Sequence, residues 1–267
     1  MKQSNLLSAI ASVLLSTAAC SGGVSAYSRP ADSNDYDDVA QALASVVATT
    51  DGGGEVGSLS DSADLAEGVM PSGVSSETSG DFAANRLGLD YQYQLRCKDA
   101  AGAALAACGR PAETAEARVD WSGYLGLPAF SASLKRQADW SLSGIPTDTV
   151  RFAGDGTFAF DSQFRSAFRP VWVNYSLDYT AGYDSVAMQK SMHRPVGGAI
   201  HYVITARRMA LRDETTVEAT FDMTAELTFG SPEMATLVLD GAHAYTVNTT
   251  SGVVGRAGEN AGPNEAE

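Results

Sequence analysis

The sequence contains few of the residues on which most catalytic sites and nucleic-acid interfaces depend. Its 267 residues include three histidines, three cysteines and 18 Lys and Arg against 32 Asp and Glu, so the formal net charge is −14. Nucleic-acid binding needs clustered basic side chains, so we expect no nucleic-acid partner. No apolar run reaches the roughly 20 residues that a membrane-spanning helix requires.

Motifs for catalysis, metals and cofactors are also missing from the sequence. His193, His201 and His243 form no metal-ligand spacing with one another or with cysteine. There is no nucleophile elbow, phosphate-binding loop or dinucleotide fingerprint. The acidic stretch at 61–68 lacks calcium-loop spacing, and in the stretch at 154–161 Asp155 and Asp161 fit a hairpin turn and a strand exit equally well. We therefore expect no catalytic residue, no metal and no cofactor. Paired hydrolytic carboxylates can be distant in sequence, so an unrecognised hydrolase stays open as an alternative.

The N-terminus has the layout of an export signal. Lys2 is followed by an apolar stretch over residues 6–15, small residues at 16–19, and then Cys20, Ser21 and two glycines. This stretch resembles the signal of bacterial lipoproteins, in which the cysteine is diacylated and becomes the new N-terminus. The resemblance implies removal of residues 1–19 and anchoring of the chain in the cell envelope through Cys20. Ser21 after the cysteine resembles the signal for outer-membrane retention. The alternative is an ordinary secretory signal cut near residues 24–26, which would leave a secreted or periplasmic soluble protein.

Cysteine parity agrees with lipidation. If Cys20 carries lipid, Cys97 and Cys108 remain as a pair, and an oxidising compartment permits a disulfide between them. We predict that bridge. The alternative is two unpaired thiols buried as small apolar groups.

The segment before residue 86 has a different composition from the rest of the chain. No Lys or Arg occurs over residues 30–85, and Gly, Ser and acidic residues are frequent. Such a composition is typical of flexible spacers, so we predict an acidic tether over residues 20–85 and a disordered acidic tail over 256–267. Within the tether we predict one helix near 35–48, because Val39, Ala42, Leu43, Val46 and Val47 have helical spacing.

From residue 86 onward the hydrophobic period changes to two. Alternating runs over residues 87–98, 115–125, 130–143, 148–161, 170–181, 198–209, 216–229 and 234–248 are separated by Gly, Pro, Asp and Asn clusters. We predict an all-β domain over 86–255 with about eight antiparallel strands in a meander, curled into a barrel or half-barrel and covered by the helix. We expect this domain to fold without the tether. A β-sandwich is the alternative fold. A transmembrane barrel shows the same alternation, but most of the runs lack aromatic residues at both ends.

The three tryptophans fall into two groups. Trp121 and Trp140 are in phase with apolar neighbours, so we expect them to pack in the core. Trp172 is out of phase with Val171 and Val173, which predicts an outward position and a contact surface.

Three functions remain compatible with these patterns. The first is a non-enzymatic envelope lipoprotein, structural or binding, displayed on its tether and attached to the membrane through Cys20. The second is a carrier of an apolar ligand inside the barrel, and the third is the secreted hydrolase. A cavity of several hundred cubic ångströms would favour the carrier, converging carboxylates in a cleft would favour the hydrolase, and a filled core would favour the first function.

Overall fold

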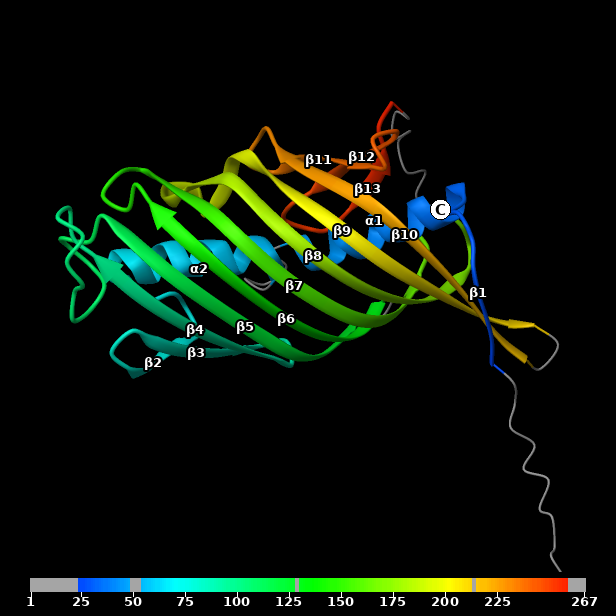
Figure 1. Ribbon diagram of the computed structural model, residues 1–267, viewed down its shortest axis with the longest axis horizontal. Helices are drawn as coiled ribbons and strands as arrows, with labels where there is room; N and C mark the ends of the chain where they lie inside the picture. Colours follow the sequence, from blue (N-terminus) through cyan, green and yellow to red (C-terminus); the bar gives the residue numbers. More distant parts are fainter. Residues whose placement is uncertain (1–23, 49–53, 128–129, 213–214, 259–267) are drawn as a thin grey trace, which may run out of the picture.

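The computed structural model describes residues 24–48, 54–127, 130–212 and 215–258. Two α-helices lie along the hollow of one curved, thirteen-stranded sheet (Figure 1). The helices are α1 (Ser33–Val47) and α2 (Gly54–Glu67). The strands are β1 (Val24–Ser28), β2 (Val74–Thr78), β3 (Asp81–Arg86), β4 (Leu89–Lys98), β5 (Thr114–Leu127), β6 (Phe130–Ser143), β7 (Thr149–Arg165), β8 (Trp172–Gln189), β9 (Arg194–Arg212), β10 (Thr215–Phe229), β11 (Met234–Leu239), β12 (His243–Asn248) and β13 (Val254–Arg256), with a short 3-10 turn, η2 (Lys190–Met192), between β8 and β9.

The sheet is an antiparallel meander, as predicted. From β2 to β13 each strand pairs with the next one in sequence, and β1 alone pairs in parallel, with β10. The strands belong to one sheet, so the alternative of a two-sheet sandwich is wrong. Over the described residues β2 and β13 do not pair with each other, and the sheet is therefore not closed. The predicted run over 234–248 is a hairpin of two strands, β11 and β12.

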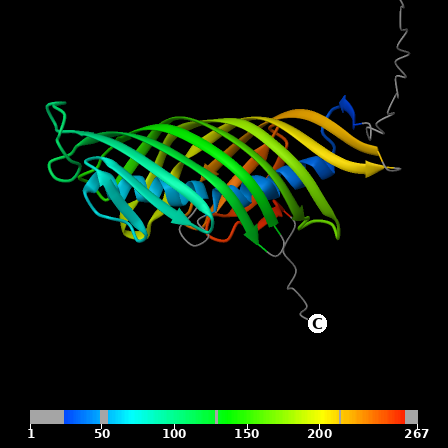
Figure 2. The same cartoon turned by 90° about the horizontal axis from the view of Figure 1, so that it is seen from below.

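Strict alternation of side chains explains why the strands form and which face they bury. In β4 the residues with odd numbers are buried and those between them are exposed or half-buried. Successive side chains of a strand point to opposite faces, so one face of the sheet is apolar and the other polar. The apolar face is the concave one, and the sheet curves around the helices (Figure 2).

Helix α1 confirms the predicted helix near 35–48. Asp32 caps it by accepting hydrogen bonds from the backbone N–H groups of Asn34 and Asp35, and the Asp35 carboxylate accepts one from the backbone N–H of Asp32. This reciprocal capping satisfies donors that the first helical turn otherwise leaves unpaired. The stripe of apolar residues lies on the buried side of the helix.

Helix α2 overturns the prediction of a flexible tether. Its residues Glu55 to Ala63 are buried, and β2 and β3 follow it before residue 86. The small Gly and Ser residues allow close packing. Ser58 and Ser62 donate to backbone carbonyl oxygens of the helix itself, and Glu55 and Asp61 are paired with side chains of the strands. Gly54 begins the helix with a φ of +73°, and a Cβ there would lie 2.0 Å from the Ala48 carbonyl oxygen, so only glycine fits this position. The predicted disordered tail over 256–267 is wrong at its first residue, because Arg256 belongs to β13 and pairs with Tyr245 of β12. Residues 20–23 and 259–267 lie outside the described residues.

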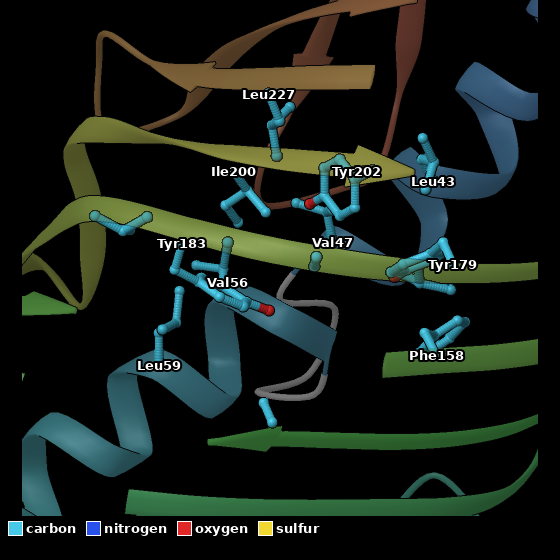
Figure 3. Packing of buried hydrophobic residues seen from close by; sticks show 14 of the residues in the cluster. Leu43, Val47, Val56, Leu59, Phe158, Tyr179, Tyr183, Ile200, Tyr202 and Leu227 are labelled. Atoms are coloured by element: carbon cyan, nitrogen blue, oxygen red, sulfur yellow. The ribbon is translucent and has the colours of Figure 1, made fainter. Parts of the chain in front are cut away.

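Both helices pack their apolar side chains into the sheet. In Figure 3 the side chains of Leu43 and Val47 from α1 and of Val56 and Leu59 from α2 lie among those of the strands. The labelled strand residues of this cluster are Phe158, Tyr179, Tyr183, Ile200, Tyr202 and Leu227. Full burial of one such large apolar side chain contributes about 1.5–3 kcal/mol, so both helices belong to the core.

Candidate functional site: the acidic interface inside the sheet

Five buried carboxylates on α1 and α2 face basic and phenolic side chains of the rest of the chain. We call this set the acidic interface, and its helical members are Asp35, Asp37, Asp38, Glu55 and Asp61, each at most 6% exposed. A carboxylate away from water is stable only when it is paired and hydrogen-bonded. The contacts of each carboxylate therefore indicate whether the interface has a structural or a catalytic role.

Glu55 lies at the centre of the interface. Its Oε1 accepts a hydrogen bond from Arg136 Nη2 at 2.9 Å and another from the Tyr183 hydroxyl, and its Oε2 lies 3.4 Å from the Tyr202 hydroxyl. The Arg136 guanidinium also lies 5.3 Å from the ring centroid of Trp140, within the range of a cation–π contact. A buried cation and anion are thus held together inside an aromatic cage.

At the N-terminal end of α1, Asp35 and Asp38 each bind an arginine and a hydroxyl group, as Glu55 does. The Tyr175 hydroxyl donates to Asp35 Oδ1 at 2.8 Å, and Arg29 donates to Asp35 Oδ2. Arg169 donates to the neighbouring Asp38, which also accepts from the Ser166 hydroxyl at 3.1 Å. These bonds join α1 to β8, to the loop after β7 and to the segment after β1.

Asp37 and Asp61 repeat the combination of an arginine and a phenol. Arg256 Nη2 and the Tyr245 hydroxyl lie 2.6 and 3.0 Å from the Asp37 carboxylate. Arg86 Nη1 and the Tyr93 hydroxyl lie 2.6 and 2.7 Å from the Asp61 carboxylate. The repeated combination indicates a structural role, because it satisfies each charge and fixes each helix on the sheet.

The shifted pKa values of these groups agree with a structural role. Burial raises the pKa of the Tyr183 and Tyr202 hydroxyls well above the usual value, and the nearby Glu55 raises it further. Burial is the strongest single influence on the pKa of Arg136 and tends to lower it, but Glu55 and the surrounding tyrosines together outweigh burial and the pKa is raised. At neutral pH the phenols therefore stay protonated donors and the guanidinium stays charged, so neither can exchange a proton as a catalyst would.

A serine, a histidine and an aspartate lie close together at α2, but they do not form a catalytic triad. They are Ser60, His193 and Asp64. The Ser60 hydroxyl lies 3.0 Å and the Asp64 carboxylate 3.4 Å from His193, and both face the same ring nitrogen, Nδ1. In a triad the nucleophile and the carboxylate contact opposite nitrogens, so that the ring can relay the proton. This arrangement therefore gives no support to the hydrolase.

Little empty space remains inside the sheet at the junction of the two helices. A cavity of about 100 Å³ lies there against β4–β6, and its walls include Val46, Tyr91, Trp121 and Leu134. Ligand sites for small molecules usually measure about 300–1,000 Å³. Three larger grooves of about 550, 450 and 470 Å³ lie on the outer face, where they open to solvent between exposed strand side chains.

The cysteines, tryptophans and histidines singled out from the sequence lie in different parts of the structure. Cys97 and Cys108 form the predicted disulfide, which ties the end of β4 to the loop before β5. Cys20 lies outside the described residues. Trp121 and Trp140 are buried, at 2% and 3% exposure. His201 and His243 are on strands, and His243 stacks on Tyr36 at the start of α1. Among the described residues, no group of His, Cys, Asp and Glu could hold a metal ion.

Sequence reasoning missed the acidic interface, although one signal for it is present. Arg136 has the same parity as Leu134, Ala138 and Trp140, so the alternation of β6 predicts that it points inward. A basic residue at an apolar position of a strand needs a buried anion nearby. The partner itself could not be named, because Glu55 is 81 residues away.

The fold and the interface define this chain as a curled antiparallel sheet filled by its own helices. No family model, curated protein or solved structure matches it. Neither of the described helices is long and apolar enough to span a bilayer.

Proposed function

We propose that this chain is a non-enzymatic cell-envelope lipoprotein, anchored through an acylated Cys20 and serving as a rigid structural or binding module. The single observation that carries the proposal is that α1 and α2 occupy the hollow of the sheet. A filled interior leaves the outer surface for contacts with partners. The proposed location is the outer membrane, on the resemblance of Cys20 and Ser21 to its retention signal.

The filled interior removes the main support for the alternative functions. A carrier needs room for its ligand, and the cavity of about 100 Å³ is below the usual size of a ligand site. A hydrolase needs carboxylates that substrate can reach, whereas Asp35, Asp38 and Glu55 are at most 1% exposed and paired with arginines. The outer surface is therefore the better candidate for the functional part of the molecule.

Fractionation of cells tests the anchor. The wild type should sediment with membranes and incorporate labelled fatty acid, and Cys20→Ser should lose both properties. A wild type that is soluble and unacylated would contradict the proposal and favour the secreted or periplasmic alternative.

Binding of an apolar fluorescent probe to the folded protein tests the filled interior. We expect no saturable binding by wild type. Saturable binding by wild type, competed by fatty acid, would favour the carrier instead.

A further inference from the structure

Trp172 occupies an outward position that core packing does not explain. It is the first residue of β8 and is 57% exposed, whereas the next residue, Val173, points inward and is 2% exposed. The outward position predicted from the sequence is confirmed. A large exposed indole beside other apolar side chains is typical of a contact surface.

The N-terminal strand begins at the same edge of the sheet as Trp172. One row of paired residues crosses β8, β9, β10 and β1: Asn174, Met209, Glu218 and Ala26. Strands β8 and β1 run in the same direction. Trp172 lies two residues before Asn174 in β8, and Val24 lies two residues before Ala26 in β1. Trp172 and Val24 are therefore at the same level along the strands, about 14 Å apart, since three strand spacings of about 4.8 Å separate them.

Cys20 is tied closely to this edge by the length of the chain. Three residues lie between it and Val24, and the four residue-to-residue steps span at most about 14 Å even when extended. Figure 1 shows β1 entering the sheet beside the outer ends of β9 and β10. A lipid on Cys20 would therefore hold this edge, and no other, at the membrane.

We propose that the edge formed by Trp172, Val171 and Met209 lies on the lipid bilayer surface, an orientation that rests on the proposed acylation of Cys20. The exposed fractions of Val171 and Met209 are 42% and 36%. Trp and Tyr concentrate at membrane–water interfaces, where the ring contacts apolar chains and the polar atom stays hydrated. A bilayer thus fits the chemistry of this edge.

A basic side chain accompanies the exposed indole. Arg165, at the end of β7, pairs directly with Trp172 across the strands and is exposed. A guanidinium at this level can bind lipid phosphate, because it forms charge-assisted hydrogen bonds with phosphate oxygens. At a membrane interface the indole would contact the acyl chains and the guanidinium would contact the lipid phosphates.

This orientation directs the opposite edge of the sheet away from the membrane. That edge carries the loop closed by Cys97 and Cys108 and the η2 turn with Met192, which is 41% exposed. The two edges can therefore be distinguished by a fluorophore placed at one or the other.

Tryptophan quenching in vesicles tests the orientation. The full chain, purified from bacterial membranes, is reconstituted into phosphatidylethanolamine/phosphatidylglycerol vesicles with brominated acyl chains, and the mass of its N-terminal peptide reports acylation of Cys20. The tryptophan emission that comes from Trp172 is the difference between wild type and Trp172→Phe. The brominated lipid should quench this emission. In the matched control Trp172→Phe/Met192→Trp, the new indole at the opposite edge should stay unquenched.

The outcomes separate this orientation from the anchor itself. An acylated protein whose Trp172 is not quenched, or whose control indole is quenched equally, overturns the orientation and leaves the anchor standing. An unacylated Cys20 overturns the anchor, and with it the orientation. Quenching of Trp172 alone in the acylated protein supports both.

Discussion

Glu55 and Arg136 show at the scale of single residues how this sheet tolerates charge in its interior. Their side chains are 1% and 2% exposed, and Glu55 Oε1 lies 2.9 Å from Arg136 Nη2. Removing water from either ion alone costs several kcal/mol. The pair is therefore stable only as a unit, whereas the arginines paired with the other carboxylates of the acidic interface are 11–43% exposed.

Arg136→Met should destabilise the protein by about 3–5 kcal/mol, because it leaves Glu55 buried without its cation. Urea unfolding of the single variant and of Glu55→Gln/Arg136→Met measures this effect, and the double variant should recover part of the loss. Arg118→Met is the matched control, since Arg118 forms only exposed ion pairs and should change stability far less. Equal effects at both arginines would contradict a buried ion pair.

Asp64→Asn should leave the protein at least as stable as wild type at pH 7. Burial raises the pKa of Asp64 above its usual 3.8, and although His193 opposes the shift, the nearby Asp61 carboxylate adds to it. A raised pKa in the folded state means that protonation stabilises the fold, so wild-type stability falls as the pH rises through that pKa. The amide cannot ionise and escapes this loss.

The pH dependence of unfolding checks the sign of that effect. The advantage of Asp64→Asn over wild type should shrink as the pH falls and disappear below about 3.8, the pKa of an unperturbed carboxyl. Asp139→Asn is the control, because the Asp139 side chain is 63% exposed. An advantage that grows as the pH falls would contradict the raised pKa.

At the scale of elements, the strands could be predicted from the sequence and α2 could not. Alternation of apolar and polar side chains identifies a strand with one dry face, and β4 to β10 show it clearly. Helix α2 is buried nearly all round, and many of its buried residues are Gly, Ser and acids. No amphipathic stripe marks such a helix, since Ser58 and Ser62 bond to the helix's own carbonyl oxygens and its buried acids to arginines and tyrosines distant in sequence. The disulfide could be predicted because parity and compartment require no knowledge of the fold.

Leu59→Ala should cost about 2–5 kcal/mol, because Leu59 is fully buried where α2 meets the sheet. Val69→Ala provides the matched control just beyond the same helix, where the side chain is 51% exposed. Thermal and urea unfolding of both variants measure the difference. Leu59→Ala with no greater effect than Val69→Ala would show that α2 does not pack on the sheet.

At the scale of the whole molecule, helices and sheet form one core, so the strands should not fold alone. A fragment of residues 86–255 lacks α1 and α2 and would expose the inward face of β4 to β10. We expect it to aggregate or to bind an apolar dye strongly, in contrast to the full chain and to the sequence-based expectation of an independent β domain. A fragment that unfolds cooperatively and binds no dye would contradict a shared core.

Hydrogen–deuterium exchange of residues 54–67 in the intact protein tests the central claim most directly. A flexible Gly/Ser-rich tether exchanges its amides within seconds, whereas a helix buried in the core exchanges only when the core opens. Peptides that cover α2 should therefore be protected as long as peptides from β7 and β8. Complete exchange of 54–67 while β7 and β8 stay protected would show that the hollow of the sheet is not filled by this helix.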